Sequence, residues 1–222
     1  MDAPLTTSET TYREIRRLVV TGEIAPGDRL VQRKLAARLG VSSIPVLEAT
    51  RRLEQDGLVT AHPNWGARVP EWTGEDIEAA YLAREALEGI ACRLFVQRAT
   101  DVHRAELAAL SDRFAAAVRA GDPGGWLECD LALHGHIVAA ARARPLMRMM
   151  EGSSLMTHTM LQAQRRLSSG NSEIMRPDPL VHEPLVAALC ASDPDAAEAE
   201  GRAHIRRVYE KLCEMAAATN SR

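Results

Sequence analysis

The most informative stretch of this 222-residue chain runs from Leu35 to Val59 and reads LAARLGVSSIPVLEATRRLEQDGLV. Two short runs with helical periodicity flank Gly40, a residue that suits the left-handed conformation of a helix C-cap. Ser42 can cap the second run, and Pro45 is tolerated there because it falls in the first helical turn. Two helices joined by a glycine turn make a helix-turn-helix, which can place its second helix in the DNA major groove. An ordinary helical hairpin within a core is the alternative.

The residues around this motif predict a winged form of it. A helix is expected over residues 7–21, before a Pro-Gly turn. After Gly57 the pattern changes to short extended runs, which predict strands at 58–61 and 67–70 around a turn. This hairpin would be the wing, and its tip could touch the DNA backbone or the minor groove.

The rest of the chain shows no strand signal and divides into helices. They are expected over residues 73–97, 101–121, 126–142, 145–167, 180–191 and 194–217. The predicted fold is therefore mainly α. It has an N-terminal winged helix-turn-helix with a small β-hairpin wing, over residues 1–72. A C-terminal antiparallel α-helical bundle follows, over residues 73–222.

Composition indicates a globular, cytoplasmic protein that does not enter a membrane. Hydrophobic residues make up 46% of the chain, yet no apolar run reaches the roughly 18 residues that span a bilayer. The N-terminus lacks the pattern of a secretory signal. The four cysteines have no CxxC spacing, which suits buried free thiols in a reducing compartment.

The net charge of −3 is unevenly distributed along the chain. Residues 1–70 carry 10 Lys and Arg against 8 Asp and Glu, whereas residues 71–222 carry 17 against 22. A mildly basic head on an acidic body suits one domain that faces nucleic acid.

Three histidines and one aspartate are predicted to converge in the bundle. Asp130 and His134 are four residues apart, so they share one face of a helix. His182 lies ten residues before Ser192, at the tip of a predicted helical hairpin, and His204 lies twelve residues after it. Two antiparallel helices would bring these two histidines level, about 15 Å from the tip. A single histidine is more often a surface residue, or a core residue whose nitrogens are hydrogen-bonded. Three histidines together with a carboxylate suit a divalent transition metal.

A charged pair interrupts the inward stripe of the first bundle helix. Arg84 and Glu88 lie one helical turn apart among residues with apolar neighbours at the same spacing. One interpretation is an ion pair within the helix whose ends are solvated. The other is that Arg84 faces a polar cavity and offers its planar guanidinium to a ligand carboxylate.

At this point the sequence resembles a known family over about residues 8–217. The head resembles the GntR superfamily of bacterial transcription regulators, and the body resembles its FadR-type ligand-binding bundle, called FCD. The head shows Gly22-x-Ile24-x-Pro26-Gly27-x-x-Leu30, Leu35-Ala36-x-x-Leu39-Gly40-Val41-Ser42, Pro45-Val46, Glu48-Ala49, Arg52-Leu53, Gly57-Leu58-Val59 and Gly66. The body shows Arg84-x-x-Leu87-Glu88, Asp130-x-x-x-His134, His182 and His204.

The resemblance implies a homodimeric regulator that binds operator DNA and responds to a small organic acid. It implies a metal at Asp130, His134, His182 and His204, with the effector beside it near Arg84. Zn²⁺ is the first choice for that metal, with Ni²⁺ and Mn²⁺ as alternatives. The DNA contacts that it implies, or that the motif suggests, are Arg33, Ser42, Ser43, Ile44, Leu47, Arg52 and Gly66.

The second helix of the motif departs from the family pattern. Members usually carry arginines where this chain has Ser43 and Leu47, whereas Arg33, just before the first helix of the motif, is kept. A bidentate arginine–guanine contact contributes about 1–3 kcal/mol of discrimination. We therefore expect a different operator or a lower DNA affinity. Ser43 can still bond phosphate, and Ile44 can touch thymine methyl groups.

Two other functions compete with a metal-containing regulator. A degenerate family member could have lost operator binding and act as a ligand-binding dimer, which the residues at 43 and 47 favour. A metalloenzyme is the second alternative, because three histidines and a carboxylate can hold an activated water. No general base is evident beside the four predicted ligands, so we expect no catalytic residues.

Overall fold

The computed structural model describes residues 6–62, 66–150 and 177–220. Two compact units are present, and the change between them falls between Asp76 and Ile77. The predicted domain boundaries, 1–72 and 73–222, stay predictions, because compactness does not show that either part folds alone. The mainly helical fold with a small sheet is confirmed.

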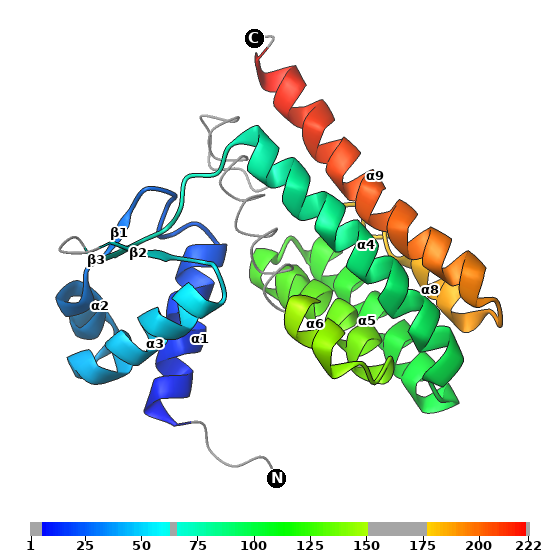
Figure 1. Cartoon of the computed structure of the whole chain (residues 1–222), viewed down its shortest axis with the longest axis horizontal. Helices are drawn as coiled ribbons and strands as arrows, with labels where there is room; N and C mark the ends of the chain where they lie inside the picture. Colours follow the sequence, from blue (N-terminus) through cyan, green and yellow to red (C-terminus); the bar gives the residue numbers. More distant parts are fainter. Residues whose placement is uncertain (1–5, 63–65, 151–176, 221–222) are drawn as a thin grey trace. The chain divides into compact units, whose positions relative to one another are not determined.

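The head is built on three helices (Figure 1). They are α1 (Thr7–Val20), α2 (Gln32–Leu39) and α3 (Ser43–Gln55). Ile15 and Leu18 of α1 and Leu53 of α3 are fully buried, because each repeats at helical spacing on the inward face. Arg33 lies inside the first turn of α2 rather than before the helix, since α2 begins at Gln32.

The turn between α2 and α3 follows from two residues. Gly40 ends α2 with φ 66°, ψ 31°, a left-handed conformation that costs glycine no steric penalty. Ser42 occupies the N-cap position of α3 with an extended backbone, but its side chain makes no capping hydrogen bond. The expected cap is therefore present in backbone geometry only.

A three-stranded antiparallel sheet forms the wing. Its strands are β1 (Arg29–Leu30), β2 (Thr60–His62) and β3 (Gly66–Arg68), in the order β1-β3-β2. The sequence predicted the hairpin of β2 and β3 but not β1, because a two-residue strand leaves no periodic signal. β2 also begins later than expected, because the Leu58 N–H still bonds the Leu53 carbonyl to close the end of α3.

Five fully bounded helices and one partial helix make up the described part of the body. They are α4 (Gly74–Arg98), α5 (Asp101–Ala120), α6 (Pro123–Ala140), α8 (Glu183–Cys190) and α9 (Pro194–Asn220). Residues 144–150 are also helical. The remainder of the helix predicted over 145–167 lies outside the described residues. In the described residues none of the helices is both long and apolar enough to cross a membrane.

The core of the body lies between these helices. α5 packs along α6, and α8 packs against α5 and α9. The apolar interior is made mainly by Phe95, Leu107, Leu133, Ile137, Leu185 and Leu189, all fully buried. The predicted inward stripe of α4, including Arg84 and Glu88, is buried as expected.

Two glycines bring α4 and α9 close together. A Cβ atom at Gly201 would lie 2.6 Å from Cys92 Sγ, and one at Gly89 would lie 3.2 Å from the Glu198 carbonyl oxygen. Neither position has room for a side chain. α4 and α9 therefore lie side by side (Figure 1), and His204, less than one turn after Gly201, is buried.

Candidate metal centre and nucleic-acid interface

His134 projects from the middle of α6 into the body. It is buried, whereas Asp130, one turn earlier on the same helix, keeps 14% of its side chain exposed. Asp130 Oδ1 lies 3.8 Å from His134 Nε2, so the two share a helix face as their spacing predicted. Asp130 therefore reaches the edge of the cluster, and His134 reaches its interior.

His182 enters the site from a helix end and not from within a helix. The sequence predicted a helix from residue 180, but α8 begins at Glu183 and His182 is its N-cap residue, with φ −92° and ψ −10°. The prediction was wrong because Pro184 would clash with the carbonyl of Leu180 in a helix that began there. The His182 ring is buried edge-on against Phe114, with ring centroids 4.5 Å apart.

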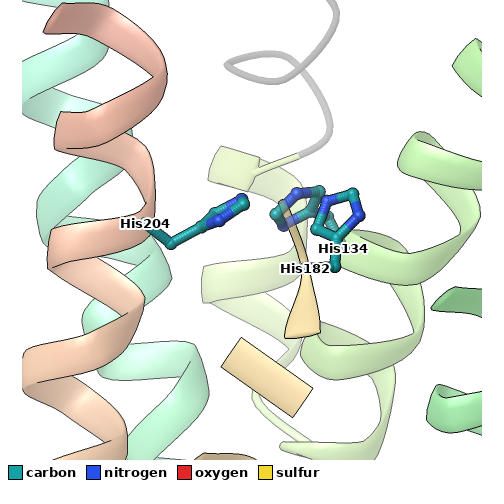
Figure 2. A group of neighbouring side chains, drawn as sticks. All are labelled: His134, His182 and His204. Atoms are coloured by element: carbon teal, nitrogen blue, oxygen red, sulfur yellow. The ribbon is translucent and has the colours of Figure 1, made fainter. Parts of the chain in front are cut away.

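The three imidazoles form one compact group. His204 points from α9 toward His134 and His182, as Figure 2 shows, and its ring centroid lies 5.4 Å and 5.0 Å from theirs. One nitrogen from each ring can be chosen so that all three lie within 4.8 Å of one another. The structure therefore brings together all three predicted histidines, and places Asp130 Oδ1 3.2 Å from His182 Nε2.

The histidines of the cluster have nitrogen atoms without hydrogen-bond partners, which suits metal binding. His182 Nδ1 and His204 Nδ1 are both buried without a hydrogen-bond partner. A buried polar atom without a partner lowers the free energy of unfolding by roughly 1–3 kcal/mol. A ligand that binds such an atom would remove this penalty. Nitrogen donors from histidine with a nearby carboxylate are a donor set that Zn²⁺ accepts.

The electrostatics of the cluster favour neutral imidazoles at His182 and His204. Burial lowers the pKa of His182, although Asp130 opposes this shift. Burial lowers the pKa of His204 well below its usual value, and the neighbouring rings of His134 and His182 lower it further. A neutral imidazole keeps a lone pair, which is the form that binds metals.

A buried carboxylate links this cluster to α4. Glu88 Oε1 lies 2.9 Å from His134 Nδ1, an ion-pair distance, and it accepts a hydrogen bond of 3.2 Å from Arg84 Nε. Burial would raise the pKa of Glu88, but His134 and Arg84 outweigh it and the pKa is lowered. Of the two interpretations of these residues, the ion pair between Arg84 and Glu88 is present, but its ends are buried and not solvated as that interpretation expected.

The contact between Glu88 and His134 was not predicted from the sequence. Its only signal was a carboxylate on the inward stripe of a helix. Which residue Glu88 meets depends on how α4 faces α6, and no spacing within one helix encodes that. In metal sites, a carboxylate of this kind orients a histidine ligand.

The predicted DNA contacts lie on the head. Ser43, Ile44 and Leu47 are all exposed on α3, and Arg33 is exposed on α2. Gly66 is exposed where β3 begins, with φ 76°. Their roles in DNA binding stay predictions.

Arg52 contacts α1, while 45% of its side chain stays exposed. Its Nη1 lies 2.8 Å from Glu9 Oε2, and its guanidinium lies over the Tyr12 ring at 3.8 Å. The arginine that shares the outward face of α3 with Ile44 is Arg51, seven residues later and exposed. The sequence analysis named Arg52 as a DNA contact but not Arg51. The positions of the buried residues Val46, Ala49 and Leu53 around α3 place Arg51 on the outward face. The role of Arg52 in DNA binding stays a prediction.

Two family models match the chain. Residues 7–69 match "Bacterial regulatory proteins, gntR family" and residues 79–207 match the FCD domain. A helix-turn-helix transcriptional regulator of Agrobacterium vitis is 34% identical over 59% of this chain and 78% of its own length. A probable D-xylose utilization operon transcriptional repressor of Paenarthrobacter nicotinovorans is 29% identical over 86% of this chain and 84% of its own length.

Solved structures share the fold. McbR (YncC) of E. coli superposes with a TM-score of 0.80 at 22% identity, over 95% of this chain and 99% of its own. A GntR-type regulator from a Rhodococcus species gives a TM-score of 0.66 at 20% identity, over 96% and 97%. At these identities the likeness concerns the fold alone.

The first prediction concerns the buried pair on α4. Arg84→Met should lower the free energy of unfolding by about 3 kcal/mol or more, because it leaves the Glu88 charge buried with one partner fewer. Arg206→Met is the matched control. Arg206 of α9 pairs with Glu85 of α4 at 2.5 Å but is 56% exposed, so its loss should change the free energy of unfolding far less. Urea denaturation in the presence of a chelator measures both. Equal losses for the two variants would show that the buried pair carries no special weight.

Proposed function

Because this chain belongs to the GntR family of bacterial regulatory proteins and carries an FCD domain, we propose that it is a metal-containing regulator that senses a small carboxylate. Its class is a transcriptional regulator, with a helix-turn-helix head for DNA and a ligand-binding FCD body. The metal, the carboxylate and the homodimer are the proposed parts. A regulator of bacterial genes works in the cytoplasm, where the chromosome lies.

The observation that carries the metal proposal is the cluster of three buried imidazoles. His134, His182 and His204 would hold the ion together with Asp130, whose carboxylate lies beside His182. Zn²⁺ is the first candidate, with Ni²⁺ and Mn²⁺ as alternatives. When bound, the ion supplies a Lewis-acidic position for an oxygen of the effector.

Arg84 is the proposed partner for the effector carboxylate. Its Nε–H donates to Glu88, and the other N–H groups of the guanidinium lie on its two Nη atoms. A carboxylate can accept two such bonds side by side. Glu88 also contacts His134. Its side chain would therefore connect Arg84, which binds the effector, to the metal ligand His134.

The head is proposed to bind a short operator as part of a homodimer. Two copies related by two-fold symmetry would present two α3 helices to two half-sites. The proposed contacts are Arg33, Ser42, Ser43, Ile44, Leu47, Arg52 and Gly66.

The residues at 43 and 47 support one competing function. Without the arginines common in the family, the protein could bind its ligand as a dimer and no longer bind an operator. A shift assay on DNA next to its own gene separates the two functions. A metalloenzyme has less support, since the family and its named relatives are regulators.

Metal content is the second prediction. Protein purified without chelator or histidine tag, and resupplied with Zn²⁺, Ni²⁺ or Mn²⁺, should hold about one ion per chain by elemental analysis. Free metal at 100 times its dissociation constant should stabilise the fold by about 2.7 kcal/mol. His204→Ala should lose both effects, whereas His103→Ala should keep them, because His103 lies outside the cluster and caps α5. Wild-type protein that stays metal-free would defeat the proposal.

Effector binding is the third prediction. Arg84→Lys keeps a positive charge beside Glu88 but loses the planar fork, so carboxylate affinity should fall roughly tenfold or more. Metal content should be unchanged. Calorimetric titration of metal-loaded protein with a panel of small carboxylates measures this, and Arg206→Lys serves as the exposed control. Equal affinities in all three proteins would remove Arg84 from the effector site.

DNA binding is the fourth prediction. Affinity should fall steeply with salt, because phosphate neutralisation releases counterions. Arg33→Ala should weaken the binding free energy by about 1–3 kcal/mol if Arg33 contacts a base. If Arg33 contacts a phosphate, the substitution should instead reduce the slope of log affinity against log salt concentration by about one. Fluorescence anisotropy on duplexes from DNA next to the protein's own gene measures both quantities. Arg119→Ala is the control, because Arg119 is an exposed arginine of α5. If Arg33→Ala and Arg119→Ala bind DNA equally well, Arg33 is not part of the interface.

A further inference from the structure

The outward face of α3 is apolar at its N-terminal end. Val46, Ala49 and Leu53 are buried and define the inward side of the helix. At 3.6 residues per turn, Ile44 and Leu47 lie on the opposite side. Ile44 is 68% exposed and Leu47 is 37% exposed.

We propose that Ile44 and Leu47 read thymine methyl groups in the major groove, so that this protein selects its half-sites by thymine and not by guanine. This inference rests on the proposed operator binding by the head. It assigns the specificity to two apolar side chains that contact the bases themselves.

The position of the two side chains supports this. A recognition helix meets the base edges with its N-terminal residues, and Ile44 and Leu47 fall within the first two turns of α3. The thymine C5 methyl is the one apolar group that an unmodified base pair presents in the major groove. Apolar side chains there would be buried against it when DNA binds.

The N-terminal end of α3 has few side chains that could read the other bases. Guanine is read most often by Arg or Lys, and neither occurs in the first two turns of α3. The carboxylate of Glu48, which could accept a bond from cytosine, instead accepts a hydrogen bond from the Ser8 hydroxyl of α1. Arg51, the first outward basic residue, lies two turns along the helix and is better placed for a phosphate or an outer base.

The neighbouring polar residue completes the interface. Ser43 is exposed one position before Ile44 and can donate to a phosphate, which fixes register without reading sequence. The helix would thus be held by its serine and arginine and would read sequence with its isoleucine and leucine. Burying one methyl group contributes about a fourfold change in an equilibrium constant.

The test begins with selection of a binding site. The full-length protein is incubated with a library of randomised duplexes, and the bound fraction is sequenced. Thymines should be enriched at fixed positions of each half-site. Recovery of no consensus would count against operator binding itself, whereas a consensus without half-site thymines would overturn only the inference about Ile44 and Leu47.

The second step removes single methyl groups. Replacing each enriched thymine by deoxyuridine deletes its C5 methyl and keeps its pairing. Wild-type affinity should fall about three- to fivefold per methyl contacted. Ile44→Ala with Leu47→Ala should bind the thymine and deoxyuridine duplexes equally well, since the partners of the methyl groups are gone.

Two controls make the result specific. Deoxyuridine outside the half-sites should leave wild-type affinity unchanged. Val102→Ala in α5, where Val102 is 66% exposed, should keep the full sensitivity to deoxyuridine. Equal wild-type affinity for both duplexes, or a double variant that stays as sensitive as wild type, would overturn the proposal. Because all three substituted side chains are exposed, loss of the fold is not expected, and circular dichroism checks it.

Discussion

Burial of three imidazole rings in one place is the constraint on which the body of this protein depends. A lone histidine in a core can turn its nitrogens toward backbone carbonyls, but three adjacent rings compete for few partners. His182 and His204 each keep a buried nitrogen without a hydrogen bond. Burial is the chief cause that lowers the pKa of both, which favours the neutral form of these two rings. An arrangement with unpaired lone pairs is costly unless it serves to bind something.

Several features of the body can be understood as supporting this cluster. Gly201 lets α9 approach Cys92 of α4, which brings His204 inward. Pro184 prevents α8 from beginning earlier in the chain, so His182 is its N-cap residue. Glu88 reaches His134 from α4 and is itself held by Arg84. Four segments that are distant in sequence are thus tied to one point, where an ion would add bonds between them.

Much of the fold could be predicted from the sequence, because helical spacing, glycine turns and proline positions are local signals. The convergence of the histidines was also predictable, since Asp130 and His134 share a helix face and the turn near Ser192 pairs the other two. Contacts between elements were harder. The contact of Glu88 with His134 and the ion pair of Arg52 with Glu9 depend on how separate helices face each other. β1 escaped prediction because two residues carry no period.

The central claim is that a metal ion binds at the three histidines and ties their segments together. Hydrogen exchange, measured by mass spectrometry on metal-free protein before and after Zn²⁺ is added, tests it most directly. The account predicts slower exchange in three separate regions at once: α6 around His134, the turn into α8 at His182, and α9 around His204. Unchanged exchange in these regions, or protection confined to another part of the chain, would contradict it.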